Sequence, residues 1–118
     1  MSNTEKKQNN FLKKIKDLDF KLDLEKETIK HNDLIKEELD NINRSYNRCL
    51  DILSRTAKGE LTDQKYNELY AENRANHLKN IDYIDSQSEQ SKKNIRTYQD
   101  EKSLLEDKLK KEENKKDS

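Results

Sequence analysis

The stretch RTAKGELT, residues 55–62, decides the fold because it holds the only glycine in a chain of 118 residues that has no proline. Glycine readily adopts the left-handed conformation that closes a helix, and basic residues beside it suit a helix C-terminus. Thr62 is suited to cap the N-terminus of a following helix. The stretch therefore predicts a turn at 58–61, with Gly59 inside it, between two helices.

Apolar residues recur at spacings of three and four on both sides of this turn, which is the period of a helical stripe and of coiled-coil packing. We expect one helix over 11–57 and another over 62–112, with a polar, frayed N-terminus at 1–10 and a disordered tail at 113–118. The predicted seam before the turn is Phe11, Ile15, Leu18, Leu22, Ile35, Leu39, Ile42, Tyr46, Cys49 and Leu53. After the turn it is Ile81, Ile84, Ser88, Ser91, Ile95, Tyr98, Lys102, Leu105 and Leu109.

The predicted fold class is all-α: two long antiparallel helices forming a coiled-coil-like helical hairpin in a single domain. A chain that folds back near Gly59 brings together residues whose numbers sum to about 119. This pairing places EKETIKHND (25–33) opposite SQSEQSKK (86–93), so both helices lose their apolar seam at the same level. We call these positions the polar waist: Thr28, His31, Asn32, Ser88 and Ser91. It is a neutral weak point, a device that sets register, or a hinge.

Composition supports long helices over a compact globule. The chain is 29% apolar and 42% charged, against about 45–50% and about 25% in a typical globular domain. Disorder is the alternative, but the lack of proline and the balance of 25 basic and 25 acidic residues weigh against it.

A hairpin leaves a second apolar set outside the seam, and we expect it to bind a further helical partner, either another protein or a second copy. The predicted partner-binding residues are Leu12, Phe20, Leu24, Leu34, Leu50, Tyr70, Tyr83 and Leu104.

Charge and hydropathy limit the classes of partner that the chain can bind. A net charge of zero argues against nucleic acid, and we interpret the lysine clusters FLKKIK (11–16) and DKLKKEENKK (107–116) as solvated helix ends. No apolar run approaches the ~20 residues of a membrane span, so we expect no membrane insertion. The polar N-terminus lacks the apolar core of a secretory signal. We expect a cytoplasmic protein, with export by a route that needs no signal peptide as the alternative.

The sequence offers no catalytic or metal-binding constellation. The two histidines, His31 and His77, are predicted to lie apart, and no Cys/His spacing suits a zinc site. Cys49 lacks a histidine partner, and carboxylate pairs on a thin hairpin lack the desolvated pocket that acid–base catalysis needs. There is no glycine-rich phosphate loop. We expect no enzyme activity and no cofactor.

In layout the chain resembles the small helical-hairpin proteins of Gram-positive type VII secretion. The WXG100 proteins of those systems carry Trp-x-Gly at the turn and Tyr-x-x-x-Asp/Glu in the tail. This turn reads AKGEL, and Tyr98 is followed four residues later by Lys102. The chain is more similar to the DUF3958-like accessory proteins of LXG toxins, whose charged C-terminal helix resembles RTYQDEKSLLEDKLKKEENKK (96–116).

That resemblance implies an accessory or targeting chaperone that binds the helical N-terminal domain of an LXG toxin, together with a second small helical accessory protein, and promotes export. The alternative is a homodimeric coiled-coil structural or spacer protein without a client. A small regulator that binds nucleic acid is a third hypothesis, which needs a basic face that the sequence does not reveal.

Overall fold

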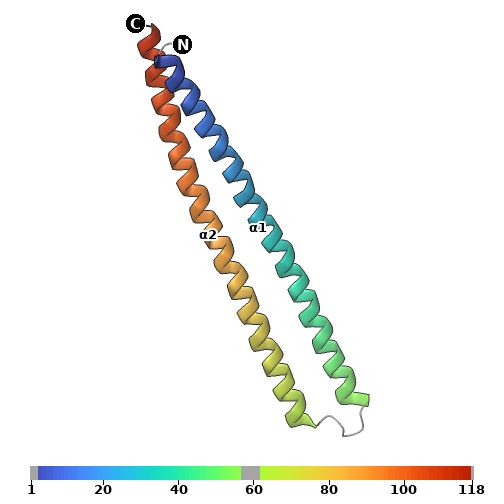
Figure 1. Ribbon diagram of the computed structural model, residues 1–118. Helices are drawn as coiled ribbons and strands as arrows, with labels where there is room; N and C mark the ends of the chain where they lie inside the picture. Colours follow the sequence, from blue (N-terminus) through green and yellow to red (C-terminus); the bar gives the residue numbers. More distant parts are fainter. Residues whose placement is uncertain (1–2, 57–61, 118) are drawn as a thin grey trace. The chain divides into compact units, whose positions relative to one another are not determined.

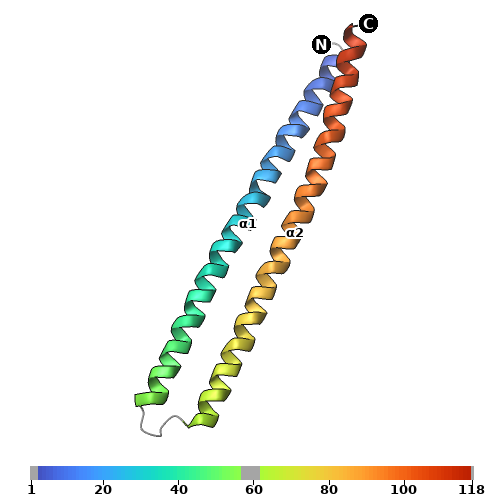
Figure 2. The same ribbon diagram turned by 180° about the vertical axis from the view of Figure 1, so that it is seen from behind.

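The computed structural model describes residues 3–56 and 62–117, and the side chains of all of these except 116 and 117. They form two α-helices, α1 (Asn3–Thr56) and α2 (Asp63–Asp117). Figures 1 and 2 show the two helices from opposite sides. The predicted fold class, an all-α helical hairpin, is confirmed.

Both helices extend further than their apolar seams. Helix α1 begins at Asn3, eight residues before the predicted start, and α2 continues to Asp117, through most of the segment predicted to be a disordered tail. The added residues are mainly Lys, Glu, Gln and Asn. The first three have high helix propensity, so the backbone stays helical where the apolar pattern has ended.

The start of α2 has the predicted cap. The backbone N–H of Lys65 donates to Thr62 Oγ1 at 3.1 Å, and the N–H of Tyr66 donates to the Thr62 carbonyl at 2.8 Å. Thr62 thereby satisfies amide groups that the first turn of a helix leaves without partners. Gly59, the other residue predicted to form the turn, lies outside the described residues.

The chain divides into two compact units. Unit 1 combines Met1–Ile29 with Glu89–Ser118, and unit 2 is Lys30–Ser88. Each unit contains a stretch of α1 and a stretch of α2. Both divisions fall inside the two polar stretches that define the polar waist.

Within each unit the two stretches run antiparallel. In unit 1, Lys102 Nζ lies 2.7 Å from Asp19 Oδ1, and Asn94 donates to Glu25 at 3.2 Å. The residue numbers rise along α1 as they fall along α2, and each pair sums to within a few residues of the predicted 119. The register of unit 1 is therefore the predicted one.

The seam of unit 1 follows the prediction. Leu18 and Leu22 are buried, with 5% and 6% of their surface exposed. The other predicted positions of this unit are half-buried, except Ser91, which is buried. Lys21 Nζ lies 5.6 Å from the centre of the Tyr98 ring, a cation–π contact that joins the two helices beside the seam.

In unit 2 the predicted seam of α2 is again confirmed, but that of α1 is wrong toward the turn. Ile42, Tyr46 and Leu53 are exposed, with 64%, 39% and 51% of their surface in solvent, and Cys49 is exposed as well. Leu50, predicted to lie outside the seam, is buried with 4% exposed. Toward the turn, the seam of α1 is therefore shifted by one residue from the predicted seam, as from Cys49 to Leu50.

Candidate functional site

The face that α1 turns toward α2 in unit 2 is mostly polar. The Asn32 amide donates to Ser88 Oγ at 3.0 Å in a buried pair. Nearer the turn, the Asn73 amide donates to Asn43 Oδ1 at 2.6 Å and to Asn47 Oδ1 at 3.3 Å. Such amide contacts are directional, so they fix which residues face each other, but each adds only about 1 kcal/mol of net stability.

An ion pair and a contact between a histidine and an aspartate continue this polar contact. Lys36 Nζ lies 2.6 Å from Asp85 Oδ1, and His77 Nε2 lies 2.9 Å from Asp40 Oδ1. The hydrogen bond to Asp85 raises the pKa of Lys36 above its ordinary value, and the neighbouring carboxylates add to the effect. Because these groups are partly in solvent, they set register more than they stabilise the unit.

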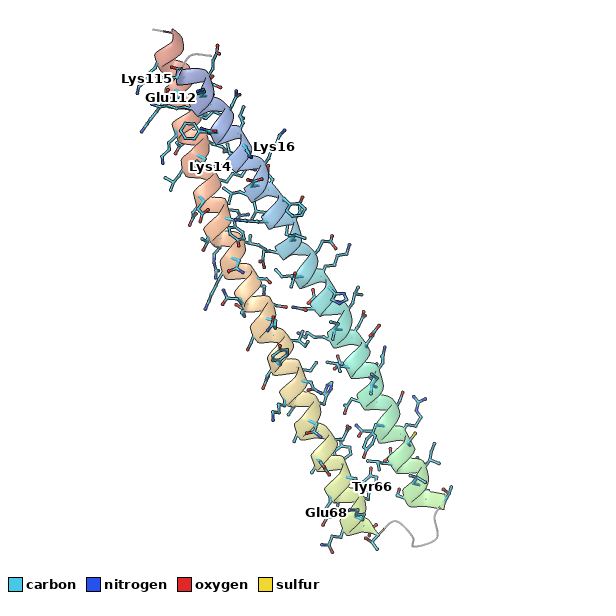
Figure 3. All side chains as sticks on the ribbon, in the orientation of Figure 1. Lys14, Lys16, Tyr66, Glu68, Glu112 and Lys115 are labelled. Atoms are coloured by element: carbon cyan, nitrogen blue, oxygen red, sulfur yellow. The ribbon has the colours of Figure 1, made fainter. Side chains whose placement is uncertain are left out.

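At the turn end of unit 2, Tyr66 Oη donates to the carboxylate of Asp51. That hydrogen bond, aided by desolvation, raises the pKa of Tyr66. The Tyr66 and Tyr70 rings stack with their centres 6.2 Å apart. Figure 3 shows Tyr66 near the start of α2 on the side toward α1.

Beside this polar side, α1 in unit 2 carries exposed apolar side chains. We define the outer face of α1 as Leu34, Ile42, Tyr46, Cys49 and Leu53, all of them exposed. Successive members lie three, four or eight residues apart, so the 3.6-residue turn places them on one side of α1. Tyr46 and Leu53 border the inner side, three or four residues from Leu50, and Leu34 lies furthest from it. In unit 2, α1 therefore turns polar side chains inward and an apolar stripe outward.

The predicted partner-binding residues are exposed, with one exception. Exposed fractions range from 40% at Tyr70 to 65% at Tyr83. Leu50 is the exception, because it is buried in the seam of unit 2 and is not available to a partner. The exposed members are Leu12, Phe20, Leu24, Leu34, Tyr70, Tyr83 and Leu104.

The predicted polar waist is only partly a feature of the seam. Asn32 and Ser88 are buried and bonded to each other in unit 2, which confirms that the two polar stretches face each other, and Ser91 is buried in unit 1 with 5% exposed. Thr28 and His31 are exposed. Thr28 Oγ1 donates to the Leu24 carbonyl of its own helix at 3.0 Å.

Among the described side chains, no three His, Cys, Asp or Glu converge in a way that would hold a metal ion. Within residues 3–56 and 62–117, neither helix contains an apolar stretch long enough to cross a membrane. Comparisons with protein-family models, curated proteins and solved structures found no match to this chain.

Proposed function

We propose that this chain is a non-enzymatic protein-interaction module that binds a helix of a partner protein along the outer face of α1. The observation that carries the proposal is the inversion in unit 2. Ile42 and Leu34 expose 64% and 54% of their surface, while Asn32 and Asn43 form hydrogen bonds on the inner side.

The energetics favour an occupant that is helical and apolar on one side. Burying a large aliphatic side chain contributes about 1.5–3 kcal/mol. Leu34, Ile42, Tyr46 and Leu53 are 39–64% exposed, so each gains part of that amount, and a partner has to bury several of them together to offset the ordering costs of association. A stripe with helical spacing fits the apolar ridge of another helix, as in helical bundles.

The proposed partner is the helical N-terminal domain of an LXG-type toxin, with this chain as its accessory or targeting factor for type VII export. The support is the resemblance in layout and in the charged C-terminal helix, to which the outer face of α1 adds a surface of suitable chemistry. Phe20 and Leu24 are exposed on α1 in unit 1 and are a separate candidate surface of that unit.

The test is copurification of the chain with a toxin domain encoded beside it, after coexpression. We expect Leu34→Asp and Ile42→Asp each to weaken the complex by at least tenfold, because an unpaired carboxylate replaces a buried aliphatic group. Leu78→Asp is the matched control, since Leu78 is equally exposed in unit 2 (51%) but lies on α2. The assignment would be refuted if all three variants weakened the complex equally, or if none of them weakened it.

The homodimer alternative gives a different result in a simpler measurement. Light scattering coupled to size exclusion over a concentration series would find a stable dimer of the chain alone, and Ile42→Asp would convert it to monomer. A 14.1 kDa species at all concentrations would leave the outer face of α1 free for a different protein.

A further inference from the structure

The antiparallel pairing in unit 1 brings together two lysine clusters that are far apart in the sequence. Residues 3–16 of α1 contain five lysines and one glutamate, and residues 108–117 of α2 contain five lysines and three acids. Their net charges of +4 and +2 lie at the same end of unit 1, although the net charge of the whole chain is zero.

Part of this charge surrounds a hollow between the two helices. Lys7 and Phe11 of α1 and Lys108, Lys111 and Lys115 of α2 line a cavity of about 580 Å³. A smaller hollow shares Lys108 and is lined by Lys14 and Leu104 as well. We call the two together the lysine groove.

Acidic residues only partly offset this charge. Glu112 lines the larger hollow, with 15% of its side chain exposed and Lys115 at 3.9 Å, and Glu101 lines the smaller one. Five lysines and two glutamates leave the groove with a net charge of +3. Figure 3 shows Lys14 on the side of α1 toward α2, and Glu112 and Lys115 near the C-terminal end of α2.

We propose that the lysine groove is a peripheral binding surface for anionic phospholipid membranes. Clusters of four to eight basic residues on a helical surface are attracted to an anionic leaflet, about fivefold in affinity for each lysine near the surface. Lysine stems are apolar, so they lie along the interface while the ammonium groups reach lipid phosphates. No helix has to insert for this mode of binding.

The apolar residues beside the lysines favour lipid over nucleic acid. Leu104 is 61% exposed and Leu12 47% exposed at this end of unit 1, and aliphatic side chains gain free energy at the boundary between headgroups and acyl chains. The ten basic residues of the two clusters are all lysines. The guanidinium groups that make bidentate contacts with nucleic-acid phosphates are thus absent from them.

The test is cosedimentation of the full chain with vesicles made of equal parts phosphatidylglycerol and phosphatidylcholine, and with vesicles of phosphatidylcholine alone. We expect binding only to the anionic vesicles, and its loss at about 1 M NaCl, where the Debye length falls to about 3 Å. The triple variant Lys7→Gln, Lys108→Gln and Lys111→Gln should weaken binding about 100-fold. Circular dichroism should show unchanged helicity, because these lysines are exposed.

The matched control removes the same charge elsewhere. Lys30, Lys79 and Lys93 are exposed and do not line the groove, so their triple change to Gln should leave vesicle binding within a fewfold of the parent. An equal loss in both triple variants would overturn the groove assignment, as would binding to phosphatidylcholine alone or to neither vesicle.

Binding to a duplex DNA oligonucleotide distinguishes the two possible ligands of the groove, lipid and nucleic acid. We expect Leu104→Gln to weaken vesicle binding about fivefold, because it removes an apolar contact with lipid. Tighter binding to DNA than to anionic vesicles, lost in the groove variant and unaffected by Leu104→Gln, would overturn the membrane proposal. This inference does not depend on the proposed partner of the outer face of α1, which lies in unit 2.

Discussion

The phase of α1 in unit 2 can be tested with two leucines three residues apart. Leu50 is 4% exposed and Leu53 is 51% exposed, although the apolar pattern alone predicts the reverse. Leu50→Ala removes a buried aliphatic side chain, so it should lower the free energy of unfolding by about 2 kcal/mol. Leu53→Ala removes a side chain already half in water, and its cost should stay below about 1 kcal/mol.

Urea unfolding followed by circular dichroism measures this difference, with thermal unfolding as the second readout. A cost of 1 kcal/mol corresponds to roughly 4 °C in Tm for a chain of this size. The comparison must be made at concentrations where sedimentation shows a monomer, so that no second copy covers Leu53. If Leu53→Ala costs as much as Leu50→Ala or more, the inner and outer faces of α1 are assigned the wrong way round.

Three further predictions concern polar contacts. A double-mutant cycle with Asn32→Ala and Ser88→Ala should give a coupling of about 1 kcal/mol in urea unfolding, and zero coupling would refute the bond. Because folding raises the Tyr66 pKa, its contribution to stability is present below the pKa of an unfolded tyrosine and is lost as pH rises through the folded-state pKa. Absorbance titrations of the parent and of Asp51→Asn should show that the substitution lowers the Tyr66 pKa, because it removes the hydrogen bond to the carboxylate. Thr62→Ala should cost about 1 kcal/mol and speed amide exchange in the first turn of α2, whereas Thr62→Ser should not.

The fold was predictable because one glycine interrupts two long patterns of the same period. The seam of α2 and of the first part of α1 followed from spacing alone, as at Leu18 and Leu22. The polar stretches were aligned correctly, as the bond from Asn32 to Ser88 confirms.

The site was harder to predict because hydrophobicity misleads in unit 2. Ile42, Tyr46 and Leu53 have helical spacing, so any frame that assigns apolar residues to the interior places them in the seam. A continuous helix preserves its phase, however, and steps of seven from Leu22 arrive at Asn43 and Leu50. That signal was present in the sequence, but it required placing an asparagine inward and three large apolar residues outward.

Predicting the lysine groove required the pairing of two lysine clusters, which no local sequence pattern contains. Each cluster alone has the composition of an ordinary solvated helix end. Their proximity follows only from the antiparallel register of unit 1, which places residues near 10 beside residues near 110.

The scarcity of buried apolar groups also affects the response to temperature. Among the described side chains, the buried hydrophobic ones are Leu18, Leu22 and Leu50. The heat capacity of unfolding arises mainly from apolar surface newly exposed to water, at about 12–15 cal/mol/K per residue in compact proteins. This chain should fall below that range, so its stability curve is shallow. Cooling and warming then change the folded population gradually, with neither a sharp temperature of maximum stability nor cold denaturation close to it.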